Sequence, residues 1–460
     1  MSIVTPDLLR RYDVPGPRYT SYPTADRFVE AFREKDYIVA LQQRKVLSAT
    51  AVQPLSLYIH IPFCESLCYY CACNKIITKH HDRAAKYLQY LERELDLHVQ
   101  HLGRGQVVSQ LHFGGGTPTF LSDEELVSLM QVLRARFEFA PDGEYSIEVD
   151  PRTVTPERLQ VLWDIGLNRL SFGVQDFDSD VQQAVHRIQT AVQVFALVEA
   201  ARKIGFKSLN VDLIYGLPKQ NPQSFARTLE QVGELRPDRI ALYGYAHLPE
   251  RFKSQRRIVR PDLPTAGDKL EMLSAAIDSF IDAGYVYVGM DHFALPDDAL
   301  AIAKRQGRLH RNFQGYSTQP DCDLIALGVS AIGRIGGTYS QNAKTLDEYY
   351  DLIDQGLLPI VRGLALSKDD LIRRAVIMAI MCQGELLFES INNAWLIDCK
   401  QYFAAEFELL RGQQEEGLVE VLDDCIRVTS KGWFFVRGVA LVFDRYLQAA
   451  RSRERFSRII

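Results

Sequence analysis

Short apolar segments rich in β-branched residues alternate with longer amphipathic segments through the first two thirds of the chain. This alternation is typical of βα units around a parallel sheet. The predicted strands cover residues 55–61, 107–113, 145–149, 169–174, 208–214 and 239–243, with one more at 285–290. The predicted helices cover residues 84–102, 123–137, 156–165, 191–204, 223–235 and 266–283. Six consecutive units predict an α/β fold, a partial (β/α)6 TIM-like barrel.

Polar or glycine-rich segments follow each of the six strands. In parallel α/β folds the binding site forms at the carboxyl ends of the strands, so such segments are expected there. In chain order they are a cysteine-rich loop, the GGGTPT run at 114–119, the EVDP run at 148–151, Gln175-Asp176, the segment 212–218 and Tyr245-Ala246-His247. The sequence therefore predicts one site assembled from several loops.

The cysteine-rich loop carries Cys64, Cys68 and Cys71 in the spacing CxxxCxxC. Three thiolates can hold three irons of a [4Fe–4S] cluster and leave the fourth iron open for chemistry. A zinc site completed by a distant ligand is the alternative, but zinc sites usually use CxxC pairs and a second pair is missing. A disulfide is less favoured, because we find no secretory signal and cytosolic thiols stay reduced.

Each of the other motifs also has a purely structural interpretation. Three glycines before Thr-Pro usually form only a tight turn, although glycine also lets the backbone approach a ligand. Glu148 is either a solvated carboxylate at a strand end or a site residue. Asp212 and Arg187 are either partners in an ordinary ion pair or part of the site. Because all four features fall at one end of the predicted sheet, we favour the functional interpretation.

Composition excludes several classes of partner. The 460 residues include 53 Lys or Arg and 58 Asp or Glu, a formal charge of −5, without a long basic run. Nucleic acid and acidic membrane surfaces are therefore not favoured. No apolar stretch approaches the length of a spanning helix, and the N-terminus lacks a signal-peptide pattern. We expect a cytoplasmic protein, a monomer, with no nucleic-acid or membrane partner.

Two segments flank the predicted barrel. We place an N-terminal lid segment at 1–50, the barrel at 51–365 and a mostly helical C-terminal domain at 366–460. Arg18, Tyr19 and Tyr22 lie in the Pro-bounded start of the chain, which is either a lid over the site or a structural strap. The C-terminal part shows helices at 371–382 and 398–416, strands at 418–421 and 426–429, and a closing helix. That order is winged-helix-like, but no arginine-rich face indicates DNA binding.

Several motifs together resemble a known family. The cysteine spacing and the GGGTP run one unit later resemble the radical S-adenosylmethionine superfamily. Within it, the chain is similar to the family of oxygen-independent coproporphyrinogen III dehydrogenases, also called oxidases, over essentially its whole length. The matching segments are residues 16–24, 64–74, 147–151, 173–176, 212–218, 290–293 and 310–316.

The resemblance implies the cofactors and their contacts. Cys64, Cys68 and Cys71 would bind a [4Fe–4S] cluster, and two S-adenosylmethionine molecules would lie beside it. Contacts to the first would come from Tyr58, Gly115, Glu148 and Ile332. Contacts to the second would come from Tyr70, Gly116, Thr117, Gln175, Arg187, Asp212 and Ala246. Tyr70 stands where relatives often have Phe. The role of Cys73 stays open.

The resemblance also implies the reaction, an anaerobic oxidative decarboxylation of the ring A and B propionates of coproporphyrinogen III to vinyl groups. Tyr58, Arg18 and Gln314 are the implied catalytic residues, and a flavodoxin- or ferredoxin-like protein is the implied electron donor. A haem-binding chaperone of the same superfamily is the main alternative, yet such chaperones usually lack the N-terminal PRYTSYPT segment and the CxC ending of the cysteine loop. A haem-opening methyltransferase is a third possibility.

Overall fold

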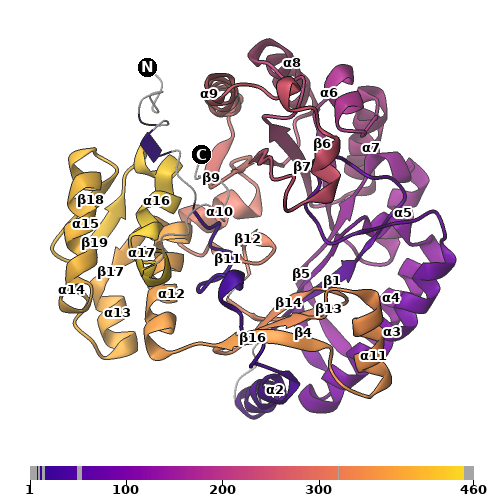
Figure 1. Cartoon of the computed structure of the whole chain (residues 1–460), viewed down its shortest axis with the longest axis horizontal. Coiled ribbons are helices and arrows are strands. Elements are labelled where there is room, and N and C mark those ends of the chain that lie inside the picture. Colours follow the sequence, from indigo (N-terminus) through magenta and orange to yellow (C-terminus); the bar gives the residue numbers. More distant parts are fainter. Residues whose placement is uncertain (1–7, 9–10, 13–15, 49–53, 320, 450–460) are drawn as a thin grey trace. The chain divides into compact units, whose positions relative to one another are not determined.

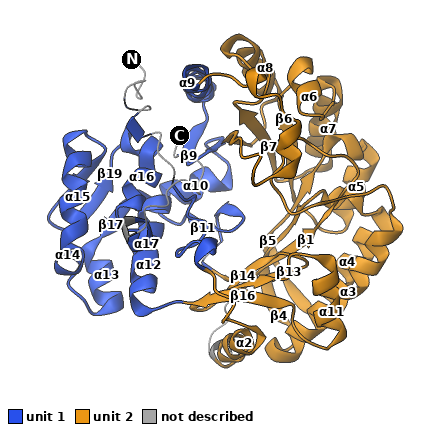
Figure 2. Ribbon diagram, viewed as in Figure 1, with its two compact units in different colours: residues 1–27, 266–321, 366–460 blue, residues 28–265, 322–365 orange. Residues whose placement is uncertain are grey.

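The computed structural model describes residues 8, 11–12, 16–48, 54–319 and 321–449. The chain divides into two compact units (Figure 2). Unit 1 comprises residues 1–27, 266–321 and 366–460, and unit 2 comprises residues 28–265 and 322–365. The start of the predicted lid, residues 1–7, and residues 450–460 lie outside the described residues. The functional domain boundaries at residues 50 and 365 stay a prediction.

Unit 2 is built mainly on one large sheet. Its strands are β1 (Leu55–Ile61), β4 (Gln106–Gly115), β5 (Phe137–Val149), β6 (Arg169–Gln175), β7 (Ser208–Tyr215), β8 (Arg239–Gly244), β13 (Asp323–Leu327), β14 (Ile332–Ile335), β15 (Thr338–Asn342) and β16 (Ile360–Ala365). Strands β1, β4, β5, β6, β7 and β8 are neighbours in that order, and all are parallel. Strand β13 pairs in parallel with the free edge of β1, and β14 to β16 extend the sheet antiparallel. The predicted six-strand α/β architecture is confirmed.

Helices cover the outer side of this sheet (Figure 1). They are α2 (Glu34–Ser48), α3 (Asp82–Leu102), α4 (Asp123–Arg134), α5 (Pro156–Asp164), α6 (Ser179–Ala184), α7 (Ala191–Ile204), α8 (Pro222–Leu235) and α11 (Leu346–Asp354). Six of them begin at a capping side chain that accepts a hydrogen bond from the backbone amide three residues later, and Asp178 of α6 and Thr345 of α11 are two of these caps. The other four caps are Ser122, Thr155, Thr190 and Asn221. These caps satisfy amides that no helical bond reaches, so the sequence defines where the helices start.

Unit 1 combines two hairpins with a helical part. Its elements are α9 (Ala266–Asp282), β9 (Val286–Gly289), β10 (His292–Ala294), α10 (Ala299–Arg305), β11 (His310–Asn312), β12 (Gly315–Ser317), α12 (Lys368–Gln383), β17 (Glu385–Leu387), α13 (Phe388–Trp395), α14 (Cys399–Tyr402), α15 (Ala404–Glu415), β18 (Val419–Val421), β19 (Cys425–Val428), α16 (Val436–Leu441) and α17 (Arg445–Ala449). Strands β17, β19 and β18 form a small antiparallel sheet. Tyr19 and Tyr22 are buried in the apolar core of this unit. Among the described helices, none is long and apolar enough to cross a membrane.

The structure corrects three boundaries. The predicted helix 123–137 ends at Arg134, because Phe137 already pairs with Gln106 as the first residue of β5. The predicted helix 398–416 is two helices, α14 and α15, interrupted at Phe403. The closing helix is likewise two helices, α16 and α17. Helix α2, inside the predicted lid segment, was not expected.

A buried carboxylate stabilises the edge of the sheet next to β1. Glu94 of α3 is completely buried. It accepts hydrogen bonds from the Gly328 amide at 2.8 Å, Asn342 Nδ2 at 2.7 Å and the Tyr349 hydroxyl at 2.5 Å. Burial raises the pKa of Glu94 to about 7, although these donors oppose the rise. These hydrogen bonds connect α3, on the outside of the sheet, to the turn after β13 and to β15.

Glu94 should make stability depend on pH. Between pH 4.5 and about 7 the folded state holds a proton on Glu94 that the unfolded state has released. The contribution of Glu94 to the free energy of unfolding is therefore fully present below the ordinary pKa of 4.5, and it decreases as the pH rises through this window. We expect a decrease of about 3 kcal/mol at most. Glu94→Gln cannot titrate, so the difference in free energy of unfolding between wild type and variant should shrink from pH 5 to pH 7.5. Urea unfolding measures this, with exposed Glu199→Gln as control. A difference that stays constant with pH contradicts the assignment.

Candidate functional site

The three predicted cluster ligands lie on the loop after β1. Within this loop, β2 (Phe63–Cys64) pairs in parallel with β3 (Ile76–Ile77). Cys64 and Cys68 are each 8% exposed, whereas Cys71 is half-buried. A hydrogen bond of 3.2 Å from the Cys71 amide to the Cys68 carbonyl closes a turn between them. This turn fixes the backbone between the second and the third cysteine.

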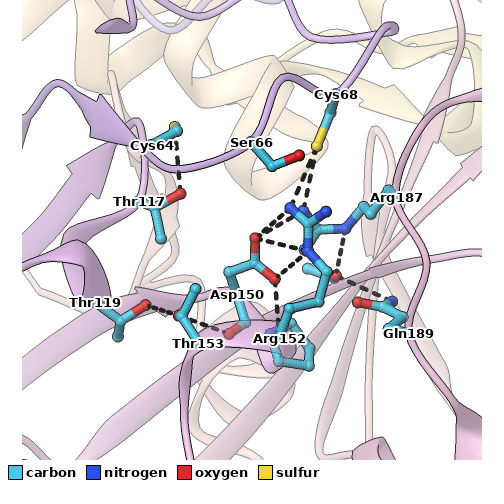
Figure 3. Close-up of polar contacts among 12 residues, drawn as sticks. Cys64, Ser66, Cys68, Thr117, Thr119, Asp150, Arg152, Thr153, Arg187 and Gln189 are labelled. Carbon is cyan, nitrogen blue, oxygen red and sulfur yellow. Dashed lines mark hydrogen bonds and ion pairs between the residues drawn. The ribbon is translucent and has the colours of Figure 1, made fainter. Parts of the chain in front are cut away.

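Hydrogen-bond donors point at two of the sulfurs (Figure 3). The Thr117 hydroxyl lies 3.3 Å from Cys64 Sγ. Arg152 Nη2 and Arg187 Nη1 each lie 3.5 Å from Cys68 Sγ. Burial raises the pKa of the Cys64 thiol, and the hydrogen bond from Thr117 opposes this rise. The direction of these donors fits a site built for ligated sulfur.

Asp150 holds the two arginines in place. Its Oδ2 atom lies 2.6 Å from Arg152 Nη2 and 3.1 Å from Arg187 Nη1. Burial opposes the charge of Asp150, but Arg187 and Arg152 outweigh it and hold the pKa of this carboxyl below its usual range. The sequence left open an ion pair between Arg187 and Asp212. The structure does not form this pair, because Asp212 instead accepts hydrogen bonds from Asn210 and Ser171.

The GGGTP turn packs directly against the cysteine loop. Gly115 has φ of 116°, a conformation that side chains rarely adopt. A Cβ atom on Gly115 would lie 2.7 Å from the His60 ring, and one on Gly116 would lie 2.7 Å from the Pro62 carbonyl oxygen. The Gly116 amide also donates to the Ile61 carbonyl at 2.7 Å. Both glycines are therefore required by close backbone approach.

Replacing Gly116 with alanine should loosen the cysteine loop. The new methyl group meets backbone atoms of Pro62, which cannot rotate away, so we expect a loss of about 1–3 kcal/mol in the free energy of unfolding. Reconstituted Gly116→Ala should bind less iron and sulfide per chain than wild type. Gly233→Ala in α8 is the matched control, since nothing lies within 4 Å of the added atom. Equal iron content and stability in both variants would contradict the packing argument.

A row of polar side chains crosses the carboxyl ends of the central strands. The Tyr58 ring stacks on His112 with centroids 6.0 Å apart, and His112 Nε2 lies 3.4 Å from Glu148 Oε1. The Glu148 carboxylate also accepts a hydrogen bond of 3.2 Å from the Gly115 amide. Burial, and secondly the charge of Glu148, raises the pKa of Asp212 to about 7. Two acceptor carboxylates on one edge can bind hydroxyl and ammonium groups.

The other predicted cofactor residues also lie in unit 2. Tyr70 packs against a small apolar cluster that includes Val181 and Leu217, and its carbonyl accepts a hydrogen bond from Gln255. Gln175 ends β6 with φ of 69°. Ala246 follows β8, and Ile332 begins β14. Thus every residue predicted to contact a cofactor belongs to one unit.

Arg18 and Gln314 belong to unit 1. The Arg18 guanidinium lies 2.7 Å from Asp291 Oδ2, and the Arg18 carbonyl accepts a hydrogen bond from Arg311 Nε. Gln314 lies between β11 and β12, and both its amide side-chain atoms are buried without a hydrogen-bond partner among the described residues. Their place relative to the cysteine loop stays a prediction.

Some residues that organise the site were not predicted from the sequence. Asp150 was part of the EVDP run but had no assigned role, and Arg152, Ser171 and Asn210 were not considered. The signal for Asp150 was present, because it directly follows β5. Asn210 lies two residues before Asp212 on the same face of β7, whereas Ser171 lies on β6 and only the pairing of β6 with β7 places it beside Asp212.

Comparisons with known proteins agree with this geometry. Residues 58–232 match the family model for the radical SAM superfamily, and residues 366–435 match the HemN C-terminal domain. The chain is 52% identical over 456 residues to the oxygen-independent coproporphyrinogen III oxidase of Pseudomonas aeruginosa, covering 99% of this chain and 98% of that protein. The chain belongs to the oxygen-independent coproporphyrinogen III oxidase family.

Other members of this family extend the match. The Escherichia coli oxygen-independent coproporphyrinogen III oxidase is 48% identical, with 98% of each chain covered. The solved structure of coproporphyrinogen III oxidase (HemN) from Escherichia coli, described as a radical SAM enzyme, superposes with a TM-score of 0.91 and 47% identity, covering 97% of this chain and 100% of that one. As a family member the chain is an oxidoreductase, and its superfamily uses a [4Fe–4S] cluster and S-adenosylmethionine.

The donor set fits such a cluster. In a [4Fe–4S] cluster each thiolate binds a different iron, so the three sulfurs need not converge on a single point. Within the described residues, no three His, Cys, Asp or Glu side chains are grouped around one metal position. Three thiols on one ordered loop, with donors directed at two sulfurs, are what the cluster needs.

Proposed function

We propose that the chain catalyses the anaerobic oxidative decarboxylation of the ring A and B propionates of coproporphyrinogen III. The product is protoporphyrinogen IX with two vinyl groups, a step of haem biosynthesis. The observation that carries this proposal is 52% identity across 99% of the chain to an oxygen-independent coproporphyrinogen III oxidase, with the cysteine loop intact. Since that identity spans both units, the haem-binding chaperone and methyltransferase alternatives are not favoured.

Cys64, Cys68 and Cys71 are the proposed iron ligands. When bound, the cluster and S-adenosylmethionine supply a 5'-deoxyadenosyl radical that removes a hydrogen atom from the substrate propionate. The chain's own contribution is to hold these groups in place and to exclude solvent. Thr117 and Arg187 stabilise charge on the coordinating sulfurs, and Asp150 keeps Arg187 oriented.

We assign the first S-adenosylmethionine to Tyr58, Gly115, Glu148 and Ile332. The Glu148 carboxylate at the end of β5 is suited to accept hydrogen bonds from ribose hydroxyls or an amino group. Its ordered position, set by the Gly115 amide and His112, supports this role. Tyr58, whose buried hydroxyl interacts with His60 at 3.0 Å, is proposed as a catalytic positioning group beside the open iron.

We also propose that the chain binds a second S-adenosylmethionine. Its contacts would be Tyr70, Gly116, Thr117, Gln175, Arg187, Asp212 and Ala246. A buried cation, Arg187 in the loop after α6, and a half-buried carboxylate, Asp212 in β7, support a zwitterionic ligand. The hydroxyl of Tyr70 adds a donor to a ring that packs against apolar neighbours.

Arg18 and Gln314 are the proposed substrate contacts. Coproporphyrinogen III carries four carboxylates, and bidentate pairing with guanidinium recognises carboxylates strongly. Three arginines gather in this part of unit 1, since Arg437 donates to the Pro17 carbonyl and Arg311 to the Arg18 carbonyl. The Arg311 Nη1 atom is buried without a hydrogen-bond partner in the described residues, which supports an anionic ligand here.

The remaining assignments concern partners and surroundings. We propose a flavodoxin- or ferredoxin-like electron donor, because each cleavage of S-adenosylmethionine consumes one electron. We also propose that the protein acts as a monomer in the cytoplasm. Size-exclusion chromatography with light scattering measures the molar mass of the reconstituted protein and so tests whether it is a monomer.

The function is tested anaerobically with reconstituted protein, dithionite and S-adenosylmethionine, with coproporphyrinogen III added or withheld. Protoporphyrinogen IX, carbon dioxide and 5'-deoxyadenosine are followed together. About two deoxyadenosines per porphyrin are expected, because the cofactor is the radical source for two propionates. Deoxyadenosine without decarboxylation would point to another porphyrin substrate. Tight haem binding without turnover would support the chaperone, and methyl transfer to haem the methyltransferase.

A further inference from the structure

The segment that follows the cysteine loop carries a local excess of positive charge. Residues 75–86 contain Lys75, Lys79, Arg83 and Lys86 against a single Asp82, a formal charge of +3 with histidines neutral. The whole chain has a formal charge of −5. A cationic segment of this kind attracts anionic partners over a distance that depends on ionic strength.

This segment is hydrogen-bonded to the strand that bears the first cluster ligand. In the pairing of β2 with β3, Cys64 lies opposite Ile77. The Thr78 amide donates to the Cys64 carbonyl at 2.9 Å, and the Ile76 amide donates to the Pro62 carbonyl at 2.7 Å. The basic residues are therefore attached by covalent and hydrogen bonds to a proposed iron ligand.

The charged side chains face solvent, and one apolar residue of the same segment is also exposed. Lys79, His80, Arg83 and Lys86 are exposed, and Ile77 is 41% exposed. We call these five residues the basic face. Lys86 lies 4.7 Å from the centre of the Tyr350 ring, which limits its motion. Two carboxylates lie nearby, Asp82 in the segment and Glu65, which interacts with His81 at 3.0 Å.

We propose that the basic face is the docking surface for a small acidic one-electron carrier protein. This inference rests on the proposed function, in which each radical is generated by one electron. The carrier loses one electron, the cluster gains it, and that electron cleaves a carbon–sulfur bond of S-adenosylmethionine to give methionine and the 5'-deoxyadenosyl radical. Complexes of this type are small and transient, and a rim of complementary charge around an apolar contact suits them.

The proposal is tested by binding, without turnover. Oxidised flavodoxin and oxidised ferredoxin are each titrated calorimetrically into reconstituted wild-type protein and into Lys79→Glu/Arg83→Glu. We expect the variant to bind its carrier at least about tenfold more weakly, and added salt to weaken wild-type binding, because charge steers such encounters. The control is Lys203→Glu/Lys207→Glu, which makes the same change of charge at exposed positions on the amino-terminal side of β7.

Dithionite separates this proposal from the proposed function. The basic-face variant should form 5'-deoxyadenosine at the wild-type rate with dithionite, and more slowly with a reduced carrier. The docking proposal is overturned if the variant binds both carriers as tightly as wild type, if wild type binds neither carrier, or if the control loses affinity equally. The proposed function instead fails if wild type with dithionite forms no porphyrin product, whatever the binding data show.

Discussion

Replacing Cys64, Cys68 or Cys71 individually with alanine should give proteins that fold but retain no [4Fe–4S] cluster and form no detectable 5'-deoxyadenosine. Three thiolates are the proposed protein ligands of the cluster, so each loss would expose a second iron to solvent and to chelation. The apo fold should survive, because the loop is already ordered by backbone hydrogen bonds such as Thr78 to Cys64. Iron and sulfide analysis and visible absorbance measure the loss of the cluster. Product detection measures the loss of 5'-deoxyadenosine formation.

The matched control for these variants is Cys322→Ala. Cys322 is a half-buried cysteine of unit 2, and its sulfur lies 3.8 Å from the Ser109 hydroxyl, away from the cysteine loop in the sequence. It should keep wild-type iron content and turnover. A loop variant that retains full iron and activity would remove that cysteine from the ligand set. Loss of both in Cys322→Ala would show that any cysteine change disturbs reconstitution.

The six βα units were predictable because their signals are local. The strand at 55–61 was found with both ends correct, since Pro54 and Pro62 bound the apolar run and proline cannot donate to a strand ladder. The helix at 191–204 was also correct at both ends, because Thr190 caps its start and Gly205 adopts the left-handed conformation that ends it. Capping and periodicity act within a few residues, so one sequence suffices to detect them.

Other parts of the fold depend on partners far along the chain. Strand β13 is five residues long and is defined by pairing with β1, more than 250 residues earlier. Helix α2 has almost no amphipathic pattern, so periodicity could not indicate it. The break at Phe403 occurs within a helical pattern, because this side chain is buried in the core of unit 1. Tertiary packing determines all three of these features.

The candidate site was predictable in position but not in its internal pairing. The rule that loops gather at the carboxyl ends of parallel strands located the cysteines, the glycine turn and Glu148. The rule does not say which carboxylate a given arginine meets. Arg187 was a candidate partner for Asp212, yet it pairs with Asp150, because the loop after β6 brings it to the end of β5 and next to Cys68.

That pairing makes Asp150→Ala the stability variant with the largest expected effect. Asp150 and Arg187 are each 8% exposed in their side chains, and Arg152 is 20% exposed. Removing the carboxylate leaves two buried guanidiniums without their shared partner beside Cys68. We expect a loss of about 3–5 kcal/mol in the free energy of unfolding. Urea unfolding of the cluster-free protein measures it directly.

The double variant Asp150→Ala/Arg152→Ala should recover part of this loss, because it removes one of the two unpaired charges together with the carboxylate. Glu199→Ala is the control, since its pair with Lys203 is solvent-exposed and should contribute less than about 1 kcal/mol. If Asp150→Ala costs no more than this control, the arginines find other partners and Asp150 does not organise the site. If the double variant is less stable than the single one, Arg152 acts through Cys68 rather than through Asp150.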